Sequence, residues 1–442
     1  MSEAAAKLGI WAWIALWVAT GTVMVADSNR FLPPVGEKYA DKVGKGGADL
    51  LPSFDSAYAW LDGQNPYHYK LKDRLPLPFA EHEEYTYQYP PTHFLVYVPF
   101  VWFAGENFLR AARLQYFVQL IATVVLALAV LDLIGAAVPL GLEQRCALLP
   151  AITLVLLLNP GSQLGLERGQ SDVFTAGLCW WSVALWLRSR YLIAAFLAVT
   201  AGLLKGYGVP FGAGLLLLGL RRDVWRKALV GSVLALVLLL APVARYIPEA
   251  IGVFPTRARM FWSNWNNQSL HNLIYTLSPK LAAPGRKVLI VVAGLVTLLA
   301  WLRAWRAQQS GTPEAQAISL SLYTCASLIF ILAFSQNSLV YNVVLVLPGA
   351  LFVALTQSRL PLTATPRAAA VLGSVLSLTM FCLCAMSIFR IAGRRPFMPD
   401  WPLHALGQLL LLGVITVISL RRPGVAGRSA TPGVVRVRHR RA

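Results

Sequence analysis

The chain has 442 residues, of which 57% are hydrophobic and only 13% are charged, and its mean hydropathy is +0.57. Soluble domains carry about 25% charged residues, so this composition excludes an ordinary soluble protein, and it also excludes disordered, collagen-like and disulfide-rich chains. The formal net charge of +19 comes from short Lys and Arg runs between apolar segments. That distribution is typical of membrane proteins rather than of nucleic-acid binding. The sequence therefore predicts an all-α polytopic membrane protein.

Twelve apolar segments are predicted as transmembrane helices. They are residues 8–26, 114–134, 146–158, 173–187, 191–204, 209–220, 228–244, 288–302, 317–334, 339–355, 368–389 and 403–420. We interpret 8–26 as a retained first span, because its apolar run is longer than that of a signal peptide and lacks a good cleavage site.

The basic residues set the orientation of these spans in a cell membrane. With both termini in the cytoplasm, the basic run 221–227 and the basic tail 421–442 fall inside, as the positive-inside rule requires. Residues 390–395, with three Arg residues, fall outside and are the exception. This orientation leaves a long first extracytoplasmic loop, 27–113, in which we expect the aromatic-rich stretch 90–105 to be an interfacial helix.

The unusual polar stretches all fall on the extracytoplasmic side of this topology. They are residues 46–67, 80–91, 159–172, 245–287 and 335–342, with Lys205 at the outer tip of an apolar hairpin. Polar breaks at membrane depth must line a cavity or be buried in protein, because lipid cannot satisfy their backbone groups. The sequence therefore predicts a functional site at the outer face.

Each of these features also has a structural explanation. Asp49 precedes an apolar run and is a candidate helix cap, and Lys205 is a candidate for snorkelling at a helix end. His82 lies among glutamates, but consecutive charges point in different directions, which favours a solvated loop over a metal site. All five cysteines lie in apolar segments without metal-ligand or CxxC spacing, so they are interpreted as buried hydrophobes.

Several motifs in a fixed order resemble one known family. Asp49 is followed by the small-residue stretch around Ala57, by the sequence GQNPY (63–67) and then by YPP (89–91). Pro160, Gly169-Gln170, Leu204-Lys205 and the sequence NQSL (267–270) follow later. This succession resembles the polyprenol-phosphate-mannose-dependent mannosyltransferases, which are GT-C membrane glycosyltransferases of family eighty-seven. Where many relatives carry an aromatic, Asp and His run, this chain has Ser335-Gln336-Asn337-Ser338.

The resemblance implies a GT-C-type fold and a hexosyltransferase that moves a sugar, expected to be mannose, from a polyprenyl-phosphate donor. The acceptor would be a lipid-linked sugar or a glycan of the cell envelope, and the transfer would invert the anomeric centre. A single carboxylate then suffices as general base. The resemblance assigns this role to Asp49, with Asp55 as the alternative.

Other residues are expected to bind the donor or to shape the loop. Lys205 and Arg113 are the candidate phosphate contacts, because Lys offers a point charge and Arg a bidentate fork. Gln170, Asn267 and Gln268 are candidates for neutral hydrogen bonds to sugar or phosphate oxygens, and Tyr67, Tyr89, Pro90 and Pro91 are expected to shape the loop. We expect neither a cofactor nor a metal, because a lipid monophosphate leaving group does not require one and no DxD pair is present.

We divide the chain into a catalytic module (1–287), C-terminal transmembrane helices (288–420) and a basic cytoplasmic tail (421–442). The expected partners are membrane lipid, the polyprenyl-phosphate sugar and a glycolipid or glycan acceptor, with no nucleic acid. A transporter or flippase of lipid-linked sugars remains the alternative function, although no internal repeat of the kind found in transporters is visible. A non-catalytic membrane partner is the third possibility.

Overall fold

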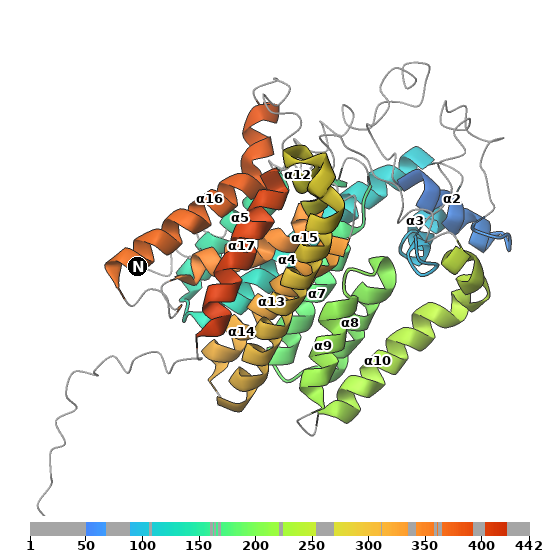
Figure 1. Cartoon of the computed structure of the whole chain (residues 1–442). Coiled ribbons are helices and arrows are strands. Elements are labelled where there is room, and N and C mark those ends of the chain that lie inside the picture. Colours follow the sequence, from blue (N-terminus) through green and yellow to red (C-terminus); the bar gives the residue numbers. More distant parts are fainter. Residues whose placement is uncertain are drawn as a thin grey trace, which may run out of the picture.

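The computed structural model describes residues 50–67, 89–105, 108–159, 162, 165–166, 169–220, 224–252, 269–310, 312–334, 342–357, 360, 365–391 and 403–421. The regular elements of these residues are all helices, which confirms the predicted all-α class (Figure 1). In chain order they are α2 (Leu50–Leu61), η4 (Phe94–Val96), α3 (Val98–Ala104), α4 (Phe108–Ala137), α5 (Leu142–Leu158), α7 (Asp172–Leu187), α8 (Tyr191–Lys205), α9 (Val209–Gly219), α10 (Trp225–Leu240), η5 (Ala241–Tyr246), α12 (Leu270–Leu277), η6 (Pro279–Leu281), α13 (Ala282–Ser310), α14 (Pro313–Phe334), α15 (Val343–Leu355), α16 (Pro366–Ile391) and α17 (Leu403–Leu420).

From residue 114 onward, the helices coincide in position with the predicted spans. Each predicted span in that part of the chain coincides with a helix, whereas the first predicted span, 8–26, lies outside the described residues. Within the described part, 5 helical stretches are long and apolar enough to cross a membrane by themselves. They are Arg110–Ala137, Trp225–Gly252, Pro279–Gln309, Pro313–Phe334 and Pro366–Leu383. The remaining predicted spans coincide with shorter apolar helices.

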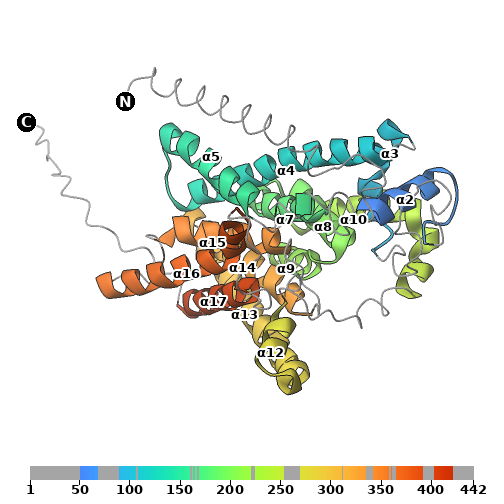
Figure 2. The same ribbon diagram turned by 90° about the horizontal axis from the view of Figure 1, so that it is seen from above.

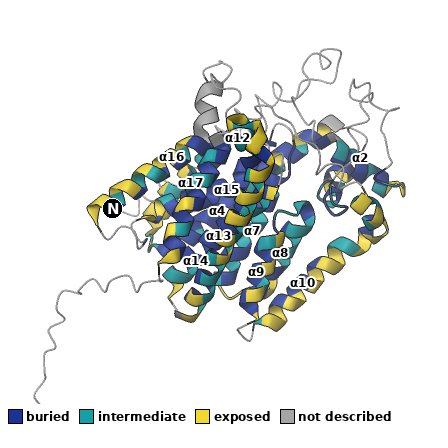
Figure 3. Cartoon of the chain, in the orientation of Figure 1, coloured by how far each residue is buried: buried dark blue, intermediate teal, exposed yellow. Residues whose placement is uncertain are grey.

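Two helices form the centre of the bundle. α14 and α15 are buried along most of their length, as expected of helices that are apolar on all sides. Seen from above, they lie between α4 and α7 on one side and α16 and α17 on the other (Figure 2). The outer helix α10 instead exposes valine and leucine side chains, such as Val230 and Val237 (Figure 3). Apolar side chains on the outside of the bundle are suited to lipid contact.

A second, smaller hydrophobic core covers one end of the bundle. It joins Leu50 and Phe54 of α2, Tyr97 at the start of α3, Phe100 within α3, and Val243 of η5. Figure 1 shows α2 and α3 together at this upper end, whereas α13 and α14 meet at the lower end. α2 and α3 are thereby packed against the start of α4 and against η5.

The stretch 90–105 does not form a span. Its longest helix, α3, has 7 residues and is about 10 Å long, which is far less than the thickness of a bilayer. Trp102 is 70% exposed and Phe103 is 60% exposed. This geometry agrees with a helix that lies at the membrane surface, where aromatic side chains are favoured.

Helices from both sides of residue 287, where we placed the end of the catalytic module, pack against each other. α14 contacts α4 and α7, and α15 contacts the same two helices. One continuous core therefore includes residues from both sides of this boundary. The division of the chain at residue 287 remains a prediction.

Candidate active site

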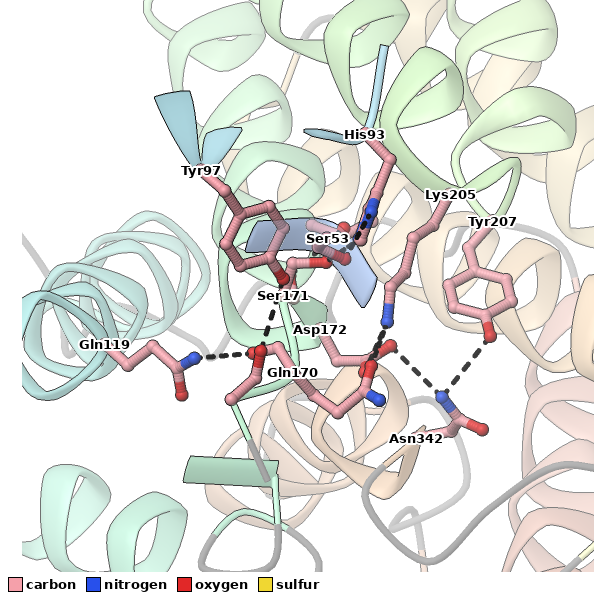
Figure 4. A network of polar contacts seen from close by, with 12 residues as sticks. Ser53, His93, Tyr97, Gln119, Gln170, Ser171, Asp172, Lys205, Tyr207 and Asn342 are labelled. Atoms are coloured by element: carbon pink, nitrogen blue, oxygen red, sulfur yellow. Dashed lines mark hydrogen bonds and ion pairs between the residues drawn. The ribbon is translucent and has the colours of Figure 1, made fainter. Parts of the chain in front are cut away.

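A buried ion pair lies at the covered end of the bundle. Lys205 is the last residue of α8, which ends because Gly206 adopts the left-handed conformation (φ 75°) that terminates many helices. The Lys205 ammonium donates to the Asp172 Oδ2 atom at 2.9 Å and to the Gln170 Oε1 atom at 2.6 Å (Figure 4). The Lys205 and Asp172 side chains are each 3% exposed. The charge of Lys205 is therefore held inside the protein and not at the lipid interface.

Asp172 connects three helices. It is the first residue of α7, where the helix dipole favours a negative charge. Its second carboxylate oxygen accepts a hydrogen bond of 3.1 Å from the Asn342 amide, which precedes α15. The same amide is 3.4 Å from the hydroxyl of Tyr207, in the turn after α8. The ends of α7, α8 and α15 are thus joined through one carboxylate.

The turn before α7 is fixed by its backbone carbonyls. The Gly169 carbonyl accepts hydrogen bonds from the Gln115 amide at 2.8 Å and from the Tyr97 hydroxyl at 3.2 Å. The Gln170 carbonyl accepts a bond of 2.8 Å from the Gln119 amide. Gly169 has φ 77°, and a Cβ atom at this position would lie 2.7 Å from Leu50 Cβ. α2, α4 and the end of η4 therefore all contact this turn, which orients Gln170.

His93 connects the segment between α2 and α3 to the same site. Its Nε2 atom is 2.8 Å from the Ser171 hydroxyl, and its Nδ1 atom is 3.5 Å from the Ser53 hydroxyl on α2. The Tyr89 ring is stacked on the imidazole with a centroid distance of 4.2 Å. The Lys205 ammonium lies 5.4 Å from the centre of the Tyr89 ring, within the range of a cation–π interaction. Tyr89 and His93 thus lie beside the ion pair and its neighbours.

The residues expected to shape this loop contact one another. The Tyr67 hydroxyl donates to the Tyr89 carbonyl at 2.8 Å, which joins the GQNPY and YPP motifs. The His93 backbone amide donates to the Pro90 carbonyl at 2.9 Å, and Pro91 is buried at the start of this turn. Burial of Tyr67, with Glu249 nearby, raises the pKa of the Tyr67 hydroxyl, which therefore stays protonated and remains a donor.

Among the predicted phosphate contacts, the structure brings Lys205 and Gln170 together but does not bring Arg113 to them. Arg113 is exposed on α4. It precedes Gln115 by two residues, about 200° around a helix, and therefore faces away from the side of α4 that bonds to the Gly169 turn.

Asp55 is set in a different environment from Lys205. It lies on α2, and its Oδ1 atom is buried without a hydrogen-bond partner among the described residues. Burial raises the pKa of the Asp55 carboxyl to about 8. The predicted base Asp49 and the predicted amide contacts Asn267 and Gln268 lie outside the described residues.

The structure adds three residues that sequence reasoning did not single out, namely Asp172, His93 and Asn342. Asp172 had a recognisable signal, because a buried lysine needs an anionic partner and Asp172 begins an apolar helix on the same side of the membrane as Lys205. His93 and Asn342 gave no such signal. Within the described part of the chain, no three His, Cys, Asp or Glu side chains form a group that could hold a metal ion.

Comparisons with known proteins place the chain in a family. Residues 87–335, more than half of the chain, match the family described as Glycosyltransferase family 87. Similar solved structures include ArnT from Cupriavidus metallidurans in the apo state (16% identity, 93% of this chain, 77% of that chain, TM-score 0.44) and the same protein bound to undecaprenyl phosphate (17% identity, 92% and 78%, TM-score 0.44). No curated protein matches the sequence. The family match confirms the resemblance drawn from the ordered motifs: the chain belongs to glycosyltransferase family 87 and is a multi-pass membrane glycosyltransferase.

Proposed function

We propose that this glycosyltransferase moves a hexose, expected to be mannose, from a polyprenyl-phosphate donor to a glycolipid or glycan acceptor at the extracytoplasmic face. Membership of a glycosyltransferase family disfavours the transporter and the non-catalytic partner as alternatives. The proposal rests on the buried Lys205 ammonium, which is bonded to Gln170 and Asp172. This site lies where α8 ends and where α7 and α15 begin. A cation in a region of low dielectric is suited to a lipid-linked phosphate.

The positions of basic residues support an outer location for this site. Asp172, Lys205 and Asn342 lie at helix ends that the predicted topology places outside. The opposite ends of the same or neighbouring helices carry Arg188 and Arg226. Because basic residues favour the cytoplasmic side, the Lys205 site is expected to face the other side.

The Asp172 carboxylate defines how Lys205 would meet the donor. Lys205 is 3% exposed, so a phosphate oxygen has to reach an ammonium that is already paired. In the proposed sequence of events, Asp172 keeps the charged lysine in place until the donor phosphate competes for it. Gln170 remains bonded to the ammonium, and Asn267 and Gln268 remain proposed additional contacts to phosphate or sugar, whereas Arg113 faces away from this site.

The proposed base is Asp49. Leu50, the next residue in the sequence, lies against the Gly169 turn. Asp55 is less suited to this role, because burial raises its pKa to about 8 and a protonated carboxyl cannot accept a proton. These two observations favour Asp49 over Asp55.

The reaction is a single displacement. Asp49 accepts the proton of the acceptor hydroxyl, whose oxygen forms a bond to C1 of the sugar as the bond between C1 and the phosphate oxygen breaks. The electron pair of that bond leaves with polyprenyl phosphate, and the Lys205 ammonium stabilises the added negative charge. This scheme requires no divalent metal, since the leaving group is a lipid monophosphate.

The test is transfer by the purified protein in lipid nanodiscs, with labelled polyprenyl-phosphate sugars and a membrane glycolipid extract. We expect labelled glycolipid with polyprenyl-phosphate mannose, and we expect the double variant Lys205→Met/Asp172→Asn to show a raised donor KM with little change in acceptor KM. The double variant avoids an unpaired buried carboxylate, so a loss cannot be ascribed to that charge. No transfer with any labelled donor would refute the proposed function, and an unchanged donor KM would remove Lys205 from the phosphate site.

A further inference from the structure

A small cavity borders Gln170 and Asp172, the two residues that bond to Lys205. It has a volume of about 10 Å³ and is bordered by Gln119 and Thr123 of α4, Ser162, Gln170 and Asp172. Gln170 and Asp172 also form hydrogen bonds with Lys205, so the cavity adjoins the ion pair. A volume of about 10–15 Å³ is the space that one water molecule needs, and it excludes a phosphate group or a sugar ring.

Three buried polar atoms of the lining residues have no hydrogen-bond partner within the part of the chain that the structure describes. They are Gln119 Oε1, Ser162 Oγ and Gln170 Nε2. The residues are 1%, 7% and 3% exposed, respectively. Buried polar groups in folded proteins nearly always have a partner, and leaving one without a partner destabilises the fold. Three such atoms on the border of one cavity indicate a shared ligand.

The three atoms are chemically complementary to a neutral oxygen ligand. Gln170 Nε2 is a donor, Gln119 Oε1 is an acceptor, and the Ser162 hydroxyl can serve as either. A water molecule would accept from Gln170, donate to Gln119 and form a third bond with Ser162, and buried waters typically make about three hydrogen bonds. We propose that this cavity is a binding site for one structural water molecule held by Gln119, Ser162 and Gln170.

This site would satisfy the Gln170 amide in the orientation that it needs to bind Lys205. The other end of that amide meets Lys205, where its Oε1 atom accepts from the ammonium at 2.6 Å. If the amide turned by 180°, an NH2 group would face the ammonium and the oxygen would face the cavity. The ammonium, which can only donate, favours the orientation with Oε1 toward it, and a water bound by Gln119 satisfies Nε2 in that orientation. The water and Gln170 thus act as positioning elements for Lys205, a consequence that rests on the proposed function.

Two substitutions at one position separate a water site from an ordinary packing site. Ser162→Ala removes one of the three bonds but leaves room for the water. Ser162→Val adds volume that fills the cavity and displaces the water, which leaves both amides without this partner. We expect Ser162→Val to lower the Tm more than Ser162→Ala does and to raise the donor KM by on the order of tenfold, with a much smaller change in kcat.

The direct measurement is a cryo-electron microscopy map at a resolution that shows ordered water, recorded without donor. We expect density within hydrogen-bonding distance of Gln119 Oε1 and Gln170 Nε2 in the wild type and in Ser162→Ala, and no such density in Ser162→Val. A wild-type map without this density, or a Ser162→Ala variant with a donor KM as high as that of Ser162→Val, would overturn the proposal. Because the map is recorded without donor, a failure of the proposed function would not affect this result.

Discussion

The ammonium nitrogen of Lys205 lies 2.9 Å from the Oδ2 atom of Asp172, and both side chains are 3% exposed. Lys205 ends α8 and Asp172 begins α7, so each charge lies at the helix end where the helix dipole favours it. A buried ion pair does not by itself guarantee stability, because both charges lose their hydration. Removing one partner nevertheless destabilises the fold strongly, because the other charge is then buried without a counter-charge.

The Lys205–Asp172 ion pair predicts how substitutions at these two positions change the stability of the protein. Lys205→Met should lower the free energy of unfolding by about 3–5 kcal/mol, because it leaves the Asp172 carboxylate unpaired. The double variant Lys205→Met/Asp172→Asn should recover most of that loss. Thermal unfolding of the three proteins in the same detergent measures the effect. Equal stability of the single and double variants would show that the ion pair is not its source.

The proposed base can be tested by an isosteric change. Asp49→Asn should reduce transfer by about 10²–10⁴-fold, because an amide cannot accept the proton of the acceptor hydroxyl. Asn caps a helix about as well as Asp, so a purely structural role would produce only a small effect. Initial rates with a saturating donor measure the change, and Asp55→Asn is the matched control that should retain most activity. If Asp55→Asn were inactive and Asp49→Asn active, the base would be Asp55.

Asp55 should make stability depend on pH. Burial raises the pKa of its carboxyl from the ordinary value of 3.8 to about 8, so between these values the folded protein keeps a proton that the unfolded chain releases. The contribution of Asp55 to stability is therefore fully present below about pH 4 and is lost as the pH rises toward 8. Asp55→Asn should reduce this slope and be more stable than the wild type near pH 8. Thermal unfolding at a series of pH values is the test, and identical slopes would contradict the assignment.

Gly169 should not tolerate a side chain. Its positive φ and the proximity of Leu50 Cβ at 2.7 Å and Gln115 Oε1 at 2.8 Å predict that Gly169→Ala is destabilising by more than the 1–2 kcal/mol cost of the left-handed conformation alone. Activity should fall as well, because the turn orients Gln170. Gly177→Ala on α7 is the control, since no atom lies within 4 Å of its added Cβ and alanine favours a helix. Similar losses in both variants would refute a specific role of the Gly169 turn.

The orientation in the membrane can be tested by thiol labelling. In a background without native cysteines, a cysteine at the exposed residue Gln64 should react with an impermeant reagent applied to intact cells. A cysteine at Gly427, in the basic tail, should react only after the membrane is permeabilised. Labelling of the tail in intact cells would reverse the proposed topology and move the candidate site to the cytoplasmic face.

Local properties of the sequence were sufficient to predict the fold class and the position of most helices. Apolar runs of membrane length predict spans wherever they occur, and glycine or proline marks where they end. The motifs predicted the family, and Lys205 was recognisable because a lysine in an apolar hairpin is unusual. Gln170 was recognisable only through its motif.

The partners of these residues were decided by the tertiary structure alone. Asp172 and Asn342 are 170 positions apart, and His93 and Ser171 are 78 positions apart, yet each pair forms a hydrogen bond. Such contacts depend on how each helix is rotated about its axis and on which helices are neighbours. Apolar helices packed in a bundle carry little sequence signal for either property, because all their faces are similarly hydrophobic. For the same reason, only the packed structure shows that the Asp55 carboxyl is buried and that Arg113 faces away from the ion pair.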